Sequence, residues 1–394
     1  MNDDEDEIDI QTPGFRFRAR AGALRVWTLG WIATVGLITL GVVVWTRAPS
    51  ETPIADRNGW SADAFRNEET QQFVGSLPTF EIVGDDGQPI SQDNRNANVR
   101  LWDAVVAVNG RNLDNIPQQV GDCVSWAYCH AGEIVICVEK AAGAAGEFHR
   151  LFPPYIYGTS RVQIGGKRLR GDGSCMAWAV KAGQEFGVLR MDADGVPPYS
   201  GSIARQWGSQ GPPRDLIEAT KMYTIGTASP VRTAHEVRDA IVNGYPVPFG
   251  AGGIGFDRVV VKYGRLVGDP PQGSWAHAQC CIGYDGSGAE PLYAILNSWG
   301  PLAGGHSPTD GSPPGSYWIT ERSMDRIARQ GDAFAISGFA GFKARKIDFK
   351  LTKTPEPQRA SPGFFAAQTT NRGLAPVGSL TRKESRHAIV DLAL

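Results

Sequence analysis

Three side chains that lie far apart in the sequence are of the types that together perform nucleophilic catalysis. Cys123 stands in QQVGDCVSWAYCHA, after a Gly-Asp pair and at the start of an apolar pattern that predicts a helix. His277 begins the strand-like run HAQCCIGYD, and Asn297 stands near the end of LYAILNSWG. A cysteine nucleophile works as a thiolate, which needs a nearby base and a positive environment. A helix N-terminus supplies partial positive charge, an imidazole supplies the base, and a side-chain amide orients that imidazole.

Each of these residues also has a structural explanation when taken alone. Cys123 can be a small buried side chain, His277 a buried strand residue, and Asn297 a turn former. Ser125 lies two residues after Cys123 and is an alternative nucleophile. An imidazole maintains a thiolate easily, whereas a serine hydroxyl needs much stronger activation, so the chemistry favours Cys123. The presence of all three types, with Trp299 beside the amide to keep water off its hydrogen bond, favours a catalytic site.

The segments that carry these residues are of two structural kinds. Apolar residues recur at steps of three and four after Cys123, which predicts a helix ending near AAGAAG. Two further helices are predicted at MAWAVKAGQEFG and HEVRDAIVNG. The later segments are short and typical of strands: VPFGA, RVVVKYG, HAQCCIGYD, LYAILNS, GSYWIT and DAFAISGF. Helices come first and strands second, which predicts an α+β fold.

Composition excludes several classes of function. The chain has 394 residues, 42% of them hydrophobic, and a net charge of −2, which is typical of a folded protein. The near-neutral balance gives no electrostatic reason to expect a nucleic-acid partner. The six cysteines form no Cys-x-x-Cys pair and the six histidines are scattered, so neither a metal site nor a cofactor is expected.

Residues 26–46, VWTLGWIATVGLITLGVVVWT, predict a membrane helix. The stretch carries no charge and is long enough to cross about 30 Å of hydrocarbon, and tryptophans lie towards its ends. A secretory signal is shorter and ends in small residues, so we expect a retained anchor. Four arginines precede the stretch between positions 16 and 25, and only Arg47 and Arg57 follow closely. This bias predicts a single-pass protein with a cytoplasmic N-terminus and residues 47–394 outside the cytoplasm.

The remaining chain divides by composition. Residues 47–95 and 343–394 are polar and turn-rich, whereas the region between them holds the periodic segments. The predicted organisation is a tail at 1–25, the membrane helix at 26–46, a linker at 47–95, a compact domain at 96–342 with a helical half at about 96–225 and a strand-rich half at about 226–342, and a polar tail at 343–394.

Together these motifs resemble the papain family of cysteine peptidases. The resemblance covers about Asn96–Phe342 and rests on QQVGDC, GDGSCMAWAVKAGQEFGVL, HAQCCIGYD, NSWG, GSYWI and FAISGFAGF. It implies two subdomains, a mainly helical half with the nucleophile and an antiparallel β-barrel half with the histidine and the amide. The active-site cleft would lie between them, and the substrate would be a peptide or protein.

The resemblance also implies roles for individual residues. Cys123 would attack a peptide carbonyl to form a thioester, and His277 would protonate the leaving amine and then activate water. Asn297 would orient His277, and Trp299 would shield their contact. The Cys123 backbone N–H and a glutamine side chain would form the oxyanion hole. The segment at Gly173 and Ser174 resembles the one that lines the substrate cleft in that family.

The turn before Cys123 departs from the family's usual pattern. Most members have a glutamine six positions before the nucleophile and a tryptophan directly after it. Here Val124 follows Cys123, whereas an alignment without gaps makes Ser125 the nucleophile and Gln119 its partner. The Gly-Asp-Cys turn resembles that of calpain-type relatives and favours Cys123, with Gln118 five positions before it. Both glutamines therefore stay candidates for the oxyanion hole.

A membrane-anchored cysteine peptidase is the main functional hypothesis. One alternative is an amidase or acyl transferase that acts on cell-wall peptides through the same three residues. Another is a catalytically inactive module that binds peptides or serves as a scaffold, which the irregular turn at Cys123 favours. Residues 47–117 show no familiar inhibitory propeptide, so activation is not expected to use one.

Overall fold

The computed structural model describes residues 7–12, 15–20, 58–221, 225–253, 256, 259–262, 264–268, 275–338 and 340–345. The chain divides into two units, Met1–Pro53 and Ile54–Leu394. In the first unit, β1 (Glu7–Thr12) and β2 (Phe15–Arg20) pair as an antiparallel hairpin. The predicted membrane helix at 26–46 lies outside the described residues, as does the tail beyond Arg345. Among the residues that are described, none of the helices has the length and apolar character needed to span a bilayer.

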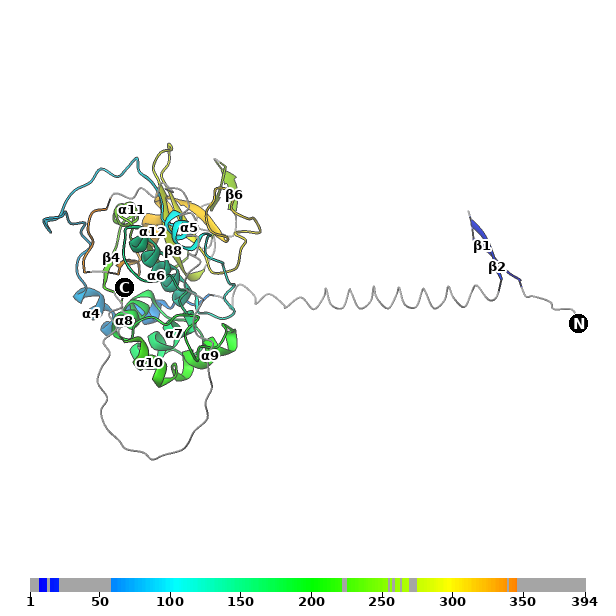
Figure 1. Ribbon diagram of the computed structural model, residues 1–394, viewed down its shortest axis with the longest axis horizontal. Coiled ribbons are helices and arrows are strands. Elements are labelled where there is room, and N and C mark those ends of the chain that lie inside the picture. The colour runs from blue at the N-terminus through cyan, green and yellow to red at the C-terminus, as the bar shows by residue number, and fades with distance from the viewer. Residues whose placement is uncertain are drawn as a thin grey trace, which may run out of the picture. The chain divides into compact units, whose positions relative to one another are not determined.

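The second unit is built around one buried helix. In Figure 1 the helices α7 to α10 gather on one side of α6, and β6, β8, α11 and α12 lie on the other. The helices are α3 (Ala62–Arg66), α4 (Glu68–Ser76), α5 (Trp102–Asn109), α6 (Cys123–Ala141), α7 (Pro153–Gly158), the π-helical turn η1 (Thr159–Ile164), α8 (Met176–Glu185), α9 (Gly201–Gln210), α10 (Arg214–Thr220), α11 (Ala234–Val242) and α12 (Glu321–Ala328).

Helix α6 begins and ends where the periodic pattern predicts. Its first residue is Cys123 and its last is Ala141, just before the glycines of AAGAAG. Nearly every residue from Cys123 to Glu139 is buried, because α6 contacts the helices α5, α7 and α8 as well as the strands β5 and β8. A helix that is buried on all faces lies in the centre of a domain.

A seven-stranded sheet forms the other half of this unit. Its order is β3-β8-β9-β10-β7-β6, and β5 also pairs with β8, so β8 is bonded along both edges. A β-bulge between Cys281 and Gly283 bends β8 where the partner on one edge changes from β5 to β3. The strands are β3 (Asn98–Arg100), β5 (Val247–Gly252), β6 (Val259–Lys262), β7 (Arg265–Gly268), β8 (Ala276–Asp285), β9 (Leu292–Leu296) and β10 (Ser316–Thr320).

The α+β prediction is confirmed, but the predicted antiparallel barrel is wrong. Across the strands that the structure describes, the sheet is open, because β6 at one end does not pair with β3 or β5 at the other. One pair, β10 with β7, is parallel. A separate antiparallel ribbon of β4 (Thr227–Pro230) and β11 (Phe334–Ser337) lies along β5, where the Gly250 N–H donates to the Asp332 carbonyl.

The segment before the compact region is folded, although the sequence predicts a linker at 47–95. From Asn58 onward it carries α3 and α4, each capped by a side chain at its N-terminus. The Trp178 indole N–H of α8 donates to Thr70 Oγ1 of α4 at 2.7 Å. Val83 forms single bridges with Pro89 and Lys343. The difference arises because these short elements are stabilised by packing rather than by a strong periodic pattern of their own.

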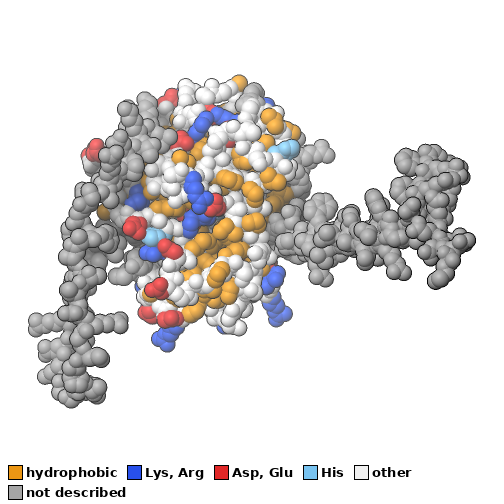
Figure 2. Space-filling view, turned by 45° about the vertical axis from the view of Figure 1, so that its right-hand side comes forward, with side chains coloured by type: hydrophobic (Ala, Val, Ile, Leu, Met, Phe, Trp, Pro, Cys, Tyr) orange, Lys and Arg blue, Asp and Glu red, His pale blue; other side chains and the backbone are white. Residues whose placement is uncertain are grey.

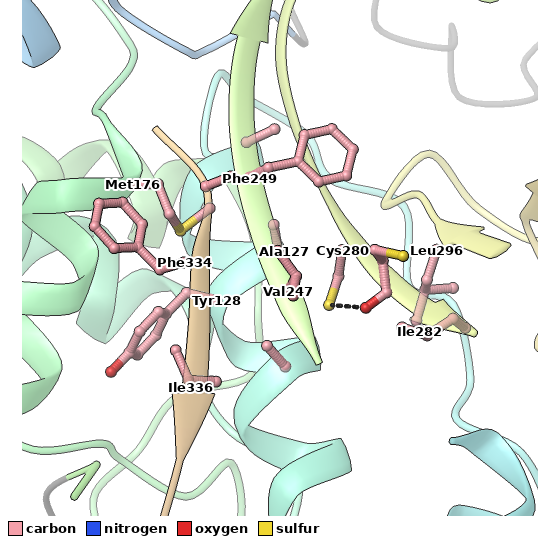
Figure 3. Close-up of a cluster of buried hydrophobic side chains, with 14 of the residues drawn as sticks. Ala127, Tyr128, Met176, Val247, Phe249, Cys280, Ile282, Leu296, Phe334 and Ile336 are labelled. Carbon is pink, nitrogen blue, oxygen red and sulfur yellow. Dashed lines mark hydrogen bonds between the residues drawn. The ribbon is translucent and has the colours of Figure 1, made fainter. Parts of the chain in front are cut away.

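The core lies between α6, α8, β5, β8 and β11. Ala127 and Tyr128 from α6, Met176 from α8, Phe249 from β5 and Phe334 from β11 belong to one cluster of buried side chains (Figure 3). All six cysteines are buried free thiols. On the face drawn in Figure 2, basic and acidic side chains are interspersed around a band of hydrophobic ones, so this face shows no patch of a single charge.

Packing of α8 against α6 generates a test of the fold. A Cβ atom at Gly183 would lie 2.6 Å from Tyr128 Cζ, and the Tyr128 ring is fully buried. We expect Gly183→Ala to lower the free energy of unfolding by about 2 kcal/mol, because overpacking outweighs the gain in helix propensity. Urea denaturation of the whole chain measures this change.

Gly75→Ala is the matched control, because Gly75 is also helical and a Cβ there meets nothing within 4 Å. It should leave stability unchanged or raise it by about 0.5–1 kcal/mol. Equal effects of the two substitutions would contradict the packing described for α8.

Candidate active site

The N-terminus of α6 positions Cys123 at the boundary between the helices and the sheet. Asp122 is the N-cap residue with a non-helical backbone, and Cys123 is the first residue of the helix. Backbone N–H groups in a first helical turn have no partner within the helix, and they carry its partial positive charge. The thiol therefore lies where a negative sulfur is best tolerated.

Cys123 is fully buried and faces β8. Burial is the main cause that raises the pKa of its thiol to about 12. The backbone groups of Ala278 and Gly59 lie close to the sulfur and oppose this rise. Ala278 directly follows His277 on β8, so the sulfur lies against the strand that carries the histidine.

His277 and Asn297 are joined by a buried hydrogen bond. Nε2 of His277 lies 2.8 Å from Oδ1 of Asn297. The same Oδ1 accepts the Ser298 backbone N–H at 2.8 Å, which fixes the amide orientation. Because an amide oxygen only accepts, Nε2 must carry the hydrogen, which leaves a lone pair on Nδ1.

The free lone pair makes His277 a base. Nδ1 is buried and has no hydrogen-bond partner among the described residues. Burial lowers the pKa of the imidazole to about 4, and the bond to Asn297 opposes this shift. At neutral pH the covered site therefore holds a neutral thiol and a neutral imidazole.

Two tryptophans cover the imidazole. The Trp299 ring lies 4.5 Å from the His277 ring at an interplanar angle of 33°. Trp275 packs on Trp299 at 4.6 Å and meets His277 edge-on at 6.3 Å. The Trp299 ring thus lies beside the residue that the sequence predicts it to shield, and the shielding role itself stays a prediction.

Asn115 is a supporting residue that the sequence does not single out. Its Nδ2 donates to the Asn297 carbonyl at 2.7 Å and to the Pro314 carbonyl at 2.8 Å. Its Oδ1 accepts the Gly300 N–H at 3.1 Å. These three bonds hold the turn at 297–300 and so fix the backbone from which Asn297 reaches His277. An asparagine in a loop gives no pattern that could reveal this role.

The two candidate glutamines lie in different environments. Gln118 is buried, donates its backbone N–H to the Ser298 carbonyl and accepts the Ser298 hydroxyl on Oε1 at 2.6 Å. Gln119 is exposed, and its Oε1 accepts the Gly201 N–H at 2.8 Å. Gln118 is thus tied to the turn that follows Asn297, whereas Gln119 is tied to α9.

Ser125 is buried and is the third residue of α6, two positions after Cys123. Successive helical residues are rotated by about 100°, so Ser125 lies about 200° around the helix from Cys123. Its hydroxyl has no hydrogen-bond partner within the described part of the chain. Since Cys123 faces β8, Ser125 points away from the strand of His277.

The residues Gly173 and Ser174 do not border an open cleft. The segment Asn58–Trp60 lies on them: the Ser174 N–H donates to the Gly59 carbonyl, and the Ser61 N–H donates to the Ser174 carbonyl, both at 2.8 Å. On its other side, the Gly59 and Trp60 N–H groups both donate to the Ala276 carbonyl at 3.1 Å.

This segment lies within residues 47–117, where the sequence shows no familiar inhibitory propeptide. Gly59 fits against Gly121 so closely that a Cβ on it would lie 2.9 Å from the Gly121 Cα. The Gly59 backbone also lies close enough to lower the pKa of the Cys123 thiol. The segment therefore lies over Cys123, the candidate nucleophile. Sequence patterns miss this segment because a stretch of three residues is too short to show a period.

Asp122 is a buried carboxyl beside the nucleophile. Its Oδ2 accepts the Tyr199 hydroxyl at 3.1 Å, and its Oδ1 has no partner among the described residues. Burial raises its pKa from the usual 3.8 to about 8. At neutral pH Asp122 is protonated, so it places no full negative charge next to the sulfur. Within the residues that the structure describes, no cluster of His, Cys, Asp or Glu could hold a metal ion.

The chain is similar to several solved structures of cysteine proteases, but only distantly. No protein-family model and no curated protein sequence matches this chain. Among solved structures, the chain is similar to xylellain, a cysteine protease from Xylella fastidiosa, with 18% identity, 66% of this chain and 95% of that chain covered, and a TM-score of 0.44. It is similar to the proform of Amb a 11, a ragweed pollen cysteine protease, with 15% identity, coverages of 80% and 75%, and a TM-score of 0.45. It is also similar to digestive procathepsin L 3 of Tenebrio molitor, with 13% identity, 71% of this chain and 83% of that chain covered, and a TM-score of 0.41. Because these scores are below 0.5, the function proposed below rests on the geometry of the site.

The protonation of Asp122 predicts a pH dependence of stability. Its pKa is higher in the folded chain, about 8, than the 3.8 of an exposed carboxyl. The stability that it contributes is complete below pH 3.8 and is lost as pH rises towards 8. Asp122→Asn does not titrate, so the variant should gain stability relative to wild type between pH 5 and pH 8. Urea denaturation at several pH values measures this difference.

Asp114→Asn is the control, because Asp114 is exposed and pairs with Arg111 at the surface. This variant should follow the wild-type pH dependence. A parallel pH dependence of Asp122→Asn and wild type would show that Asp122 is ionised in the folded chain at neutral pH.

Proposed function

We propose that this chain is a papain-like cysteine peptidase in which Cys123 is the nucleophile, His277 the base and Asn297 the residue that orients the base. One observation carries the proposal. The bond from His277 Nε2 to Asn297 Oδ1 leaves a basic Nδ1 on the strand whose next residue, Ala278, lies against the Cys123 sulfur. Nucleophile, base and orienting group thus come from three elements that the fold packs together.

The reaction begins with a proton transfer from the Cys123 sulfur to Nδ1 of His277. The thiolate attacks the carbonyl carbon of a peptide bond, and the negative charge moves to the carbonyl oxygen. That oxygen is stabilised by the Cys123 backbone N–H at the start of α6. A glutamine side chain completes the oxyanion hole, and its link to the turn after Asn297 favours Gln118 over Gln119.

The second half of the reaction returns the proton. His277 gives the proton on Nδ1 to the leaving amine, which breaks the peptide bond and leaves a thioester on Cys123. The imidazole then removes a proton from water, and the resulting hydroxide attacks the thioester. The released acid leaves Cys123 as a thiol again, so protons and electron pairs balance over the cycle.

Anchoring in a membrane, with the catalytic unit outside the cytoplasm, is also part of the proposal. Its support is the uncharged stretch at 26–46 and the excess of arginines before it. The likeness of the Gly-Asp-Cys turn to calpain-type relatives is a further sequence argument for Cys123 over Ser125.

The decisive test compares variants of the whole chain in hydrolysis of a mixed fluorogenic peptide library and in labelling by a thiol-directed epoxide. Because Asn58–Trp60 covers Cys123, each variant is also made with Trp60→Ala. Cys123→Ala should abolish hydrolysis and labelling. His277→Ala should lower hydrolysis by at least about 100-fold, since it removes the general base.

Ser125→Ala is the matched control and should retain both hydrolysis and labelling. Loss of hydrolysis in Ser125→Ala, with retention in Cys123→Ala, would transfer the role to the serine. Peptide binding without hydrolysis in every variant would instead favour the inactive peptide-binding module.

A further inference from the structure

The side chain of Trp60 fills a pocket beside the candidate nucleophile. Trp60 is 8% exposed, and its indole N–H donates to Asp332 Oδ2 at 2.7 Å. The ring lies against Gly250 and Gly252 of β5, where a Cβ at Gly250 would lie 2.6 Å from Trp60 Nε1 and one at Gly252 would lie 3.2 Å from Trp60 Cζ3. Two glycines on the same face of one strand thus leave room for a large flat ring.

The base of the pocket is the carboxylate of Asp332, which accepts three hydrogen bonds. Asp332 is fully buried just before β11. Its Oδ1 accepts the Ala177 N–H at 2.9 Å, and its Oδ2 accepts the Met176 N–H at 2.8 Å, both from the first turn of α8. Burial raises the pKa of Asp332 to about 7, and these donors together with Trp60 oppose the rise. Trp60 is the donor that reaches this carboxyl from the side of the pocket.

The pocket is continuous with the candidate catalytic residues. Gly59, the neighbour of Trp60, lies close enough to Cys123 for its backbone to lower the pKa of the thiol. Its N–H donates to the Ala276 carbonyl, and its carbonyl accepts the Ser174 N–H. One residue of extended chain spans about 3.5 Å. A peptide that replaced Gly59 at the sulfur would therefore present an adjacent side chain to the Trp60 pocket.

We propose that this pocket, formed by Asp332, Gly250 and Gly252, is a substrate-specificity pocket that selects tryptophan, and that the chain's own Trp60 fills it until a substrate displaces it. This inference rests on the proposed peptidase function, because it treats the peptide at Cys123 as the substrate.

Selection for tryptophan follows from the chemistry of the pocket. The glycine wall fits a planar ring, and the carboxyl at the base requires an N–H donor at the ring's far end. Phenylalanine fits the wall but leaves the carboxyl without that donor. A hydrogen bond to a charged group of this kind corresponds to a preference of about ten- to a hundredfold. Lysine carries a donor but lacks the flat surface that the wall fits.

Binding, rather than turnover, gives the clearest test. The protein is the whole chain with Cys123→Ala, to prevent cleavage, and with Trp60→Ala, to empty the pocket. The probes are capped alanine hexapeptides that carry one tryptophan, phenylalanine or lysine at each position in turn, measured by calorimetry. At one position, tryptophan should bind at least about tenfold more tightly than phenylalanine or lysine. Equal affinities at every position, or a preference for lysine, would overturn the proposal.

Asp332→Asn should weaken the preference, because one side-chain oxygen is then left to accept from three N–H donors, the two of α8 and the indole. Asp310→Asn is the matched control, since Asp310 Oδ2 accepts the Trp318 indole N–H at 2.6 Å in a separate tryptophan–carboxyl pair. It should keep the preference. Loss of the preference in both variants would show that it does not arise at Asp332.

Trp60→Phe serves if Trp60→Ala does not fold, because it keeps the ring and removes only the donor. With Cys123→Ala, it should bind the tryptophan peptide at least about tenfold more tightly than the chain with Trp60 intact. Equal affinity would overturn the displacement step.

Failure of the proposed peptidase function can be told apart from failure of this inference. In the first case, tryptophan peptides would still bind more tightly than the others, but chains with Cys123 intact would hydrolyse nothing. Hydrolysis without tryptophan selectivity would overturn this inference alone.

Discussion

The packing of α6 against β8 is the constraint on which the whole candidate site depends. Cys123 and His277 lie on different elements, and they share one region only because α6 packs against β8. α6 is buried on nearly all faces, and β8 is bonded along both edges, so neither element can shift without breaking many contacts. Pairing of β8 with β9 then brings Asn297 to the histidine. A rigid frame thus places three reactive side chains from distant parts of the chain.

Burial decides the electrostatic state of this site. It raises the pKa of Cys123 to about 12 and lowers that of His277 to about 4, so the proton rests on the sulfur in the covered state. Asp122 is also neutral at pH 7, because burial raises its pKa to about 8. The segment Asn58–Trp60 lies over Cys123 and adds to its burial, which disfavours an ion pair of thiolate and imidazolium. Under the proposed function, withdrawal of this segment would relieve the cost of charge separation.

The sequence predicts those parts of the structure that depend on local pattern. The steps of three and four after Cys123 predict α6, and the apolar run at His277 predicts β8, because burial of one face imposes a period. The candidate nucleophile, base and amide follow from the chemistry of their side chains. Features that depend on distant contacts were not predictable. Trp60 and Asp332 are 272 residues apart in the chain, and nothing local pairs them.

The features that the sequence did not predict correctly also depend on contacts between distant parts of the chain. Whether a sheet closes is decided by its edge strands, and no strand pattern in the sequence shows that β6 does not pair with β3 or β5 among the described strands. Helices as short as α3 are marginal alone and form because the core covers them. Asn115 holds the turn at Asn297 through bonds that only the folded chain creates.

Trapping of the covalent intermediate tests the central claim most directly. The whole chain with Trp60→Ala would be mixed with a peptide ester, quenched in acid within the first turnover and digested, and the acylated residue located by mass spectrometry. A thioester at Cys123 that accumulates in the presence of His277 and is lost in His277→Ala is the predicted result. An acyl group on Ser125, or acylation of Cys123 that is unchanged by His277→Ala, would contradict it.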